Sequence, residues 1–167
     1  MTTGDGRIGH GFGPVFDAGS RVLILGSFPS VKSREVGFYY GHPQNRFWRV
    51  LGRILNDPAP DGIEERKAYL SRHGVALWDS VVSCEITGSA DAAIRDPEPA
   101  NLTRILSVSP TRAVFCNGAL SYSLLQKNET LPKGLPVFRL PSTSPANAAW
   151  SLDRLAEEWK IVSAYLQ

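Results

Sequence analysis

Residues 26–55, GSFPSVKSREVGFYYGHPQNRFWRVLGRIL, combine side chains that could bind a flat, neutral ligand. Tyr40 precedes Gly-His-Pro and could stack on an aromatic ring, although a loop tyrosine more often packs at the edge of a core. The Asn45 carboxamide could hold a water molecule or read the polar edge of a heterocycle. Alternatively, Asn45 only satisfies nearby backbone N–H groups at the start of a helix.

A second polar loop, PSTSPAN at 141–147, places three hydroxyls between two prolines. We expect a helix to begin near Ser144, so that these hydroxyls and the free N–H groups of its first turn suit a phosphate. A plain helix cap by Ser144 is the alternative. Pro29 and Ser30 form a similar turn after another apolar run, so two such turns would flank one crevice. The residues predicted to contact the phosphate backbone of a ligand are Pro29, Ser30, Ser142, Thr143, Ser144 and Pro145.

Arginines recur at positions 46, 49 and 53, which is helical spacing. A solvated helix face is the commoner interpretation of such a pattern. Arg46, at the end of the loop 26–46, is the arginine for which a phosphate contact competes best with that interpretation.

Motifs for metal or nucleophilic chemistry are missing from the sequence. It contains no Gly-x-Ser-x-Gly elbow and no His-Glu-x-x-His. His10, His42 and His73 are scattered, and His73 precedes a glycine at an expected helix end, where a cation favours the helix dipole. We therefore expect a site without metal or cofactor, which works by positioning and electrostatics.

Apolar runs and amphipathic segments alternate along the chain. Strands are expected at 21–27, 75–82, 112–118 and 135–140, and helices from 43, at 63–74, 99–110 and 119–128, and from 144. This alternation predicts one domain, 1–167, with a flexible tail at 1–13. Its fold class is a three-layer α/β/α sandwich around a central, mostly parallel four-stranded sheet. Ligands of such sheets bind at the carboxyl ends of the strands, where the loops 26–46, 79–98, 117–119 and 141–147 meet.

The composition is that of an ordinary globular protein, with 43% apolar and 20% charged residues. No apolar run is long enough to span a membrane, and the first twenty residues lack the apolar core of a signal peptide. The two cysteines, Cys84 and Cys116, match no metal or redox spacing, so we expect reduced thiols in an intracellular protein. We also expect a monomer that is located in the cytoplasm. The net charge of +2 permits a polyanionic partner without requiring one.

Two segments in the expected order resemble the uracil-DNA glycosylase superfamily. GHPQNRFW resembles the HPxNxFW segment of the mismatch-specific uracil and thymine glycosylases, and LPSTSPAN resembles the second motif of the superfamily, whose loop enters the minor groove. The resemblance covers most of the chain, from VLILGSFPS to the terminal helix. It implies a DNA glycosylase that extrudes a base from double- or single-stranded DNA.

One departure from the mismatch-specific enzymes changes the expected chemistry. Where they carry a water-orienting Asn, this chain has Phe28, within GSFPS. That pattern, together with LWDSVVSCEITGSADAAI, is similar to the hypoxanthine-DNA glycosylase branch, which implies that Asn45 is the catalytic residue and that Tyr40 stacks on the base. The implied base contacts are Gly26, Ser27, Phe28, Tyr40 and His42.

The resemblance implies a monofunctional enzyme that releases a deaminated base, hypoxanthine first of all, and leaves an abasic site. Such a base has a ring N–H and an adjacent carbonyl, which distinguish it from its parent. Three alternatives remain open at this point. They are excision of uracil, alone or in addition, a non-catalytic nucleic-acid binder, and an unrelated small-molecule binder.

Overall fold

A parallel four-stranded sheet forms the centre of the molecule. The computed structural model describes residues 7–86 and 94–167. The strands are β2 (Val22–Gly26), β3 (Val75–Asp79), β6 (Ala113–Asn117) and β7 (Val137–Leu140), in the order β3-β2-β6-β7. All three pairings are parallel. The predicted sheet is therefore confirmed, and β2 and β3 are buried along their whole length because helices cover both faces.

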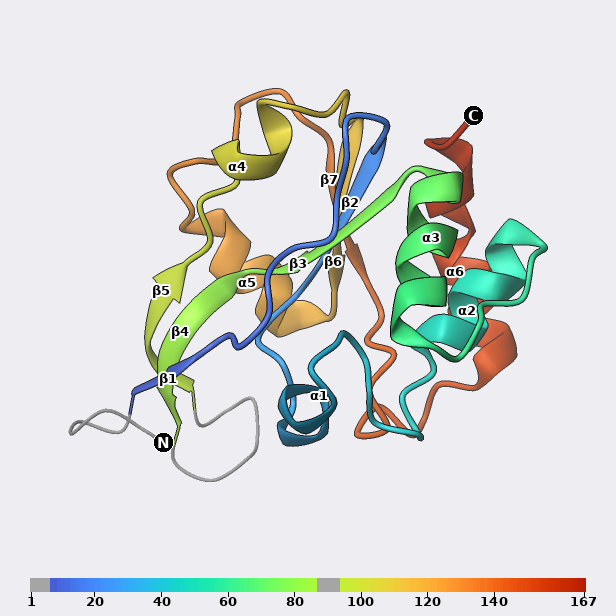
Figure 1. Ribbon diagram of the computed structural model, residues 1–167, viewed down its shortest axis with the longest axis horizontal. Helices are drawn as coiled ribbons and strands as arrows, with labels where there is room; N and C mark the ends of the chain where they lie inside the picture. Colours follow the sequence, from blue (N-terminus) through green and yellow to red (C-terminus); the bar gives the residue numbers. More distant parts are fainter. Residues whose placement is uncertain (1–6, 87–93) are drawn as a thin grey trace.

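Helices form the two outer layers (Figure 1). On one side lie α2 (Phe47–Leu55), α3 (Ile63–His73) and α6 (Leu152–Ala164), and on the other α4 (Thr103–Leu106) and α5 (Ala119–Gln126). Phe47 and Trp159 are fully buried and meet edge to face at 5.9 Å between α2 and α6. The apolar stripes that the sequence shows on these helices thus make the core.

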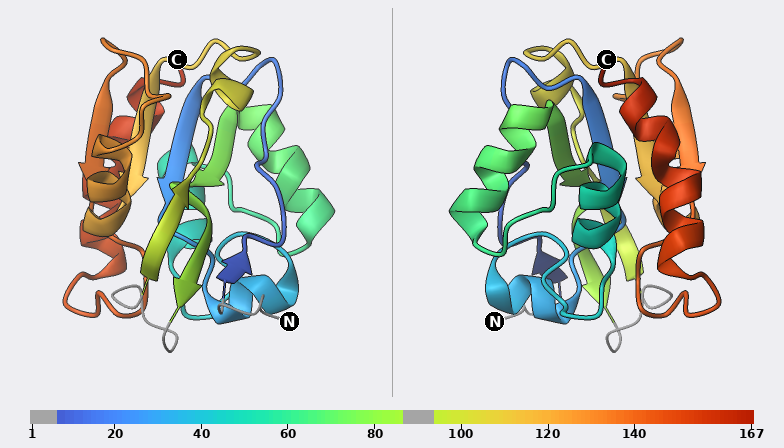
Figure 2. Two further views of the ribbon diagram at one scale, coloured as in Figure 1. Left: turned by 90° about the vertical axis from the view of Figure 1, so that its left-hand side faces the viewer. Right: turned by 90° about the vertical axis from the view of Figure 1, so that its right-hand side faces the viewer.

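A second, antiparallel sheet was not expected from the sequence. It contains β1 (Arg7–Gly9), β4 (Val81–Ile86) and β5 (Ile94–Pro99), in the order β1-β4-β5. β4 follows β3 after a single residue, and the two views of Figure 2 show the small sheet beside the central one. β5 has the sequence IRDPEP, whose prolines argue against a strand but are tolerated at an edge.

The prediction of a flexible tail at 1–13 is wrong for residues 7–13. Arg7–Gly9 pair with β4, and the Tyr39 hydroxyl donates to the carbonyl of Gly13 at 2.8 Å. Residues 1–6 of that tail, and residues 87–93 of the predicted loop 79–98, lie outside the described residues.

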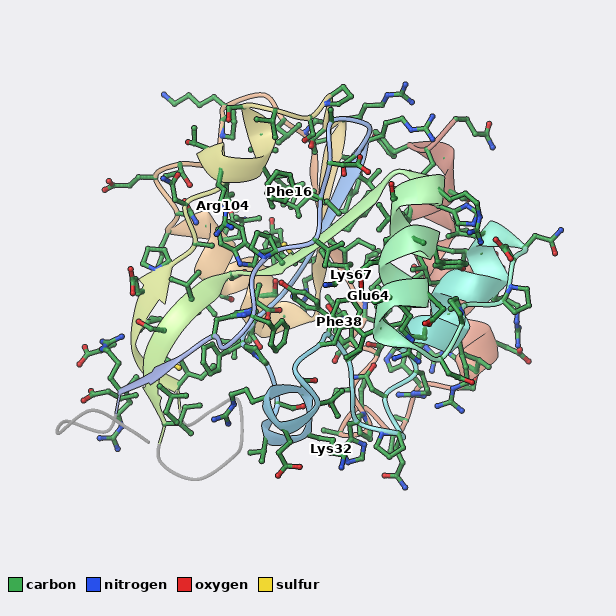
Figure 3. The ribbon with its side chains drawn as sticks, viewed as in Figure 1. Phe16, Lys32, Phe38, Glu64, Lys67 and Arg104 are labelled. Carbon is green, nitrogen blue, oxygen red and sulfur yellow. The ribbon has the colours of Figure 1, made fainter. Side chains whose placement is uncertain are left out.

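The loop after β2 contains a short helix, α1 (Val31–Val36), which the sequence analysis missed. Ser30 caps it, because its hydroxyl accepts from the Ser33 N–H at 3.1 Å. In Figure 3, Lys32 projects outward from α1, whereas Phe38 lies inside and stacks on Trp48 at 6.0 Å. After this helix the chain returns to the interior of the protein and reaches Tyr39 and Tyr40.

Three predicted helix boundaries are wrong. α2 begins at Phe47 rather than 43, and α4 has four residues within the expected 99–110. α6 begins at Leu152, where Ser151 and not Ser144 supplies the cap by accepting from the Arg154 N–H at 3.2 Å. The end of α3 at Gly74 is confirmed, since that residue adopts the left-handed conformation at φ 73°.

Both cysteines are buried free thiols. Burial raises the pKa of Cys116 to about 11, so this thiol is unreactive at neutral pH. Among the residues that the structure describes, no helix is long and apolar enough to cross a membrane.

Candidate active site

A cavity of about 110 Å³ lies at the carboxyl ends of the central strands, as predicted for a parallel sheet. It is smaller than the ~300–1,000 Å³ typical of pockets for drug-sized ligands, which suits one compact ring system. Residues that are far apart in the sequence line it, among them Gly26, Phe28, Tyr40, Asn45, Asp79 and Thr143.

Asn45 precedes α2 instead of lying in its first turn. Its Oδ1 accepts two hydrogen bonds, from the Phe47 N–H and from the Thr143 hydroxyl, both at 2.9 Å. Because an N–H group can only donate, the bond from Phe47 shows which end of the amide is oxygen. The Nδ2 group has no hydrogen-bond acceptor among the described residues, so Asn45 offers a donor at the cavity.

Thr143 holds this amide in place. It is fully buried, and its hydroxyl accepts from Asn117 Nδ2 at 3.0 Å while its N–H donates to Asn117 Oδ1 at 3.0 Å. The burial of Thr143 gives no support to the predicted DNA contact, which stays a prediction. Sequence reasoning missed Asn117, although its position directly after an apolar run in the loop 117–119 was a usable signal.

The remainder of the loop 141–147 is organised by its own side chains. Ser142 Oγ accepts from the Ser144 N–H, and Ser144 Oγ accepts from the Ala146 N–H, each at 3.1 Å. The loop is therefore a series of side-chain turns and not the helix N-terminus that was expected. Ser142 and Ser144 line the cavity, and a backbone contact by them or by Pro145 stays a prediction.

Arg46 is directed at the same loop. Its guanidinium donates to the carbonyls of Ser144 at 3.1 Å, Asn147 at 3.0 Å and Trp150. These bonds tie the loop to the start of α2, and a phosphate contact by Arg46 stays a prediction. Arg49 is exposed one turn further along α2, and within the described chain it has no hydrogen bond or ion pair.

Tyr40 lies on the floor of the cavity in a left-handed conformation, at φ 52°. Its ring stacks on Phe47, with centroids 4.0 Å apart and planes at 21°. Its buried hydroxyl has no hydrogen-bond partner among the described residues. Burial, together with the nearby Asp79 charge, raises the pKa of Tyr40 far above its ordinary value, so the hydroxyl stays protonated. Stacking of Tyr40 on a base stays a prediction.

The segment 26–30 forms one wall. A Cβ on Gly26 would lie 2.4 Å from Asp79 Oδ1 and 3.2 Å from the Tyr40 hydroxyl, so only glycine fits there. Ser27, Phe28, Pro29 and Ser30 all line the cavity. Phe28 is 7% exposed and packs with β4.

His42 is not brought to this cavity. It lines a neighbouring hollow of about 620 Å³, and its Nδ1 accepts from the Gln44 N–H at 3.0 Å. Its predicted base contact is thus not supported by its position. Tyr40 and Asn45 line both hollows.

Asp79 and His10 are functional candidates that the sequence analysis missed. Asp79 ends β3, is 4% exposed and lines the cavity. Its Oδ2 lies 2.7 Å from Nε2 of His10, which follows β1. The signal was a carboxylate directly after the apolar run VALW, but nothing in the sequence pairs it with a histidine 69 residues earlier.

Comparison with known proteins identifies the family. The model of the uracil DNA glycosylase superfamily matches residues 14–165, which include the central sheet and every residue that lines the cavity except Phe12. The chain belongs to the uracil DNA glycosylase superfamily.

Two relatives within the superfamily have the same name. The hypoxanthine DNA glycosylase of Methanosarcina acetivorans is 34% identical over 159 residues, which are 93% of this chain and 98% of the relative. The hypoxanthine DNA glycosylase of Methanosarcina barkeri is 35% identical over 114 residues, 67% of this chain and 72% of the relative.

A solved structure of the superfamily has the same fold. It is the solution NMR structure of a Methanosarcina acetivorans protein assigned to the uracil DNA glycosylases. It superposes with a TM-score of 0.78 at 32% identity, covering 93% of this chain and 96% of the other. The α/β/α architecture around the cavity is thus that of the superfamily.

Proposed function

We propose that this member of the uracil DNA glycosylase superfamily is a monofunctional DNA glycosylase that excises hypoxanthine from DNA and leaves an abasic site. The observation that carries the proposal is the Asn45 amide, oriented by Phe47 and Thr143 so that its NH₂ group serves a ligand in a cavity of nucleobase size. The two relatives named hypoxanthine DNA glycosylase support this choice of base.

The base must leave the helix to enter the cavity, at a cost of a few kcal/mol that is smaller for a mispaired base. Tyr40, backed by Phe47, supplies an aromatic surface for the extruded ring. Stacking of a base on an aromatic side chain contributes about 1–3 kcal/mol, which offsets much of the cost of extrusion.

Hydrolysis breaks the bond between C1′ of the sugar and N9 of hypoxanthine. The bonding electrons leave with the base, water adds its oxygen to C1′, and a proton from the water ends on the released base. Both acceptor sites of Asn45 Oδ1 are occupied, so Asn45 acts through its N–H donors, on a water lone pair or on an acceptor of the leaving base. This favours stabilisation of the leaving base or placement of the water over abstraction of a proton.

DNA would lie across the hollows that adjoin the cavity. One of about 620 Å³ is lined in part by Arg49 and Arg53, and another of about 640 Å³ by Arg139 and Ser142. We propose contacts to the backbone of double- or single-stranded DNA from the exposed Arg49 and Arg139, from Ser30, Ser142 and Ser144, which line the cavity, and from Pro145, which follows Ser144. We propose that the enzyme acts as a monomer in the cytoplasm.

The experiment is single-turnover excision from matched duplexes that contain inosine, uracil or neither, followed by alkaline cleavage of abasic sites. The proposal expects faster cleavage at inosine than at uracil, and none in the undamaged duplex. Cleavage at uracil alone would show that uracil, and not hypoxanthine, is the excised base. Binding of DNA without cleavage at either base would contradict the proposed activity.

A further inference from the structure

Asp79 is a buried carboxylate for which the proposed function has so far no role. It stands at the end of β3 and is 4% exposed. Oδ2 is engaged with His10 at 2.7 Å, whereas Oδ1 accepts no hydrogen bond from any described residue. Because Asp79 lines the cavity, Oδ1 is the carboxylate oxygen that a donor of a bound ligand can meet.

The position of Oδ1 shows which ligand group would meet it. A Cβ on Gly26 would come within 2.4 Å of Oδ1 and 3.2 Å of the Tyr40 hydroxyl, so both oxygens lie over the end of β2. Asp79, Gly26 and Tyr40 also line the cavity together. A base stacked on Tyr40 would therefore present its edge to the Asp79 carboxylate.

We propose that Asp79, positioned by His10, reads the ring N–H of the extruded base and selects hypoxanthine over uracil. This inference rests on the proposed glycosylase function and names the residue that determines its choice of base.

The selection follows from the groups on either side of the ring N–H. In hypoxanthine, N1–H is flanked by the O6 carbonyl on one side and by C2–H on the other. A carboxylate that faces N1–H and C2–H meets one strong and one weak donor. In uracil, N3–H lies between two carbonyls, so either approach of the carboxylate sets oxygen against oxygen. Adenine presents the N1 lone pair at that place and is repelled as well.

His10 determines which way the carboxylate points. It is 7% exposed, its ring meets that of Phe12 edge to face with centroids 4.6 Å apart, and its backbone N–H donates to the carbonyl of Val82 at 2.9 Å. Its Nε2 occupies Oδ2 and so leaves Oδ1 for the base. His10 is accordingly a positioning residue, contributed by the segment that follows β1.

The test compares inosine and uracil excision by the same preparation of each variant, so that the ratio of the two rates does not depend on the folded fraction. In Asp79→Asn the amide oxygen stays with the His10 donor, so the NH₂ group meets the ligand, where it cannot accept from hypoxanthine N1–H but can donate to a carbonyl of uracil. We expect the ratio of inosine to uracil excision to fall by at least about 10², since a polar group matched to one ligand is mismatched to the other. Glu157→Gln, the same chemical change on the exposed face of α6, serves as the control and keeps the wild-type ratio.

Two substitutions of His10 separate positioning from general stability. His10→Gln can still donate to Oδ2 from a similar place and is expected to keep the preference for inosine. His10→Phe keeps a somewhat larger aromatic ring without a donor and is expected to lower the ratio.

An active wild-type enzyme whose ratio is unchanged by both Asp79→Asn and His10→Phe would overturn this inference and leave the proposed function intact. A wild-type enzyme that releases neither base would overturn both.

Discussion

The cavity has two polar sides that are built differently. On the donor side, defined as Asn45 with Thr143 and Asn117, a chain of three side chains occupies the amide oxygen and leaves an NH₂ group for the ligand. On the acceptor side, defined as Asp79 with His10, one histidine occupies one carboxylate oxygen and leaves the other. In both, a second residue determines what the first one offers. The site is thus specified by pairs of residues rather than by single side chains.

The largest expected effect is the loss of the donor side. Asn45→Ala removes the NH₂ group, and single-turnover excision of hypoxanthine should fall by ~10²–10³, as for the loss of one preorganised donor. Asn45→Asp should be at least as damaging, because a negative charge replaces the donor. If Asn45 only caps α2, its loss would instead cost about 1 kcal/mol in the free energy of unfolding while excision stays normal. Urea unfolding beside the excision assay distinguishes the two.

Substitutions of Tyr40 test whether the extruded base stacks on the cavity floor, between the donor side and the acceptor side. Tyr40→Ala should weaken binding of the extruded base by about 1–3 kcal/mol through loss of the stack. Tyr40→Phe should change excision little, because the hydroxyl makes no hydrogen bond with described residues. A folded Tyr40→Ala protein with normal excision would show that Tyr40 is only the edge of the core.

Thr143 tests whether the donor side depends on its second residue. Thr143→Val keeps the shape of the side chain and removes one of the two hydrogen bonds to Asn45 Oδ1. The hydrogen bond that orients the amide contributes about 1 kcal/mol, so its loss should lower the excision rate about fivefold. Thr143→Ser retains the hydroxyl and should remain near wild type. Equal rates for the Val and Ser variants would break the link between Thr143 and Asn45.

Arg49 should show the smallest effect, and one that is independent of the base. Removing a phosphate contact lowers the slope of log affinity against log salt by about one unit. Arg49→Gln should do this equally for inosine and undamaged duplexes, in contrast to any change at Asn45 or Asp79. The control is Arg112→Gln, just before the amino end of β6 and thus at the opposite end of the strands from the cavity, for which the slope should not change. An unchanged slope for Arg49→Gln would show that Arg49 is a solvated surface residue that contacts no phosphate.

The polar loop 141–147 shows where prediction from the sequence failed. Its three hydroxyls suggested a phosphate-binding site at a helix N-terminus, but α6 begins only at Leu152. Thr143 instead faces inward, to Asn45 and Asn117. The direction of a loop side chain depends on which distant segments lie beneath it, and local pattern carries no information about them.

The sequence by itself determined the central sheet, the helical layers and the edge at which the site lies. Apolar runs such as 21–27 and amphipathic stripes such as that of α6 are local signals, because burial of one face requires a local period. Gly74 as a helix end and Asn45 as a residue of the site could likewise be read from neighbours in the chain.

Only the tertiary structure decided what each residue of the site offers. Which atom of Asn45 faces the cavity depends on Thr143, 98 residues away, and the orientation of Asp79 depends on His10, 69 residues away. The close approach of Asp79 and Tyr40 over Gly26 likewise exists only after β2 and β3 pair. The physical reason is that a hydrogen bond acts over about 3 Å, so its partners are chosen by the packing of the sheet and not by distance along the chain.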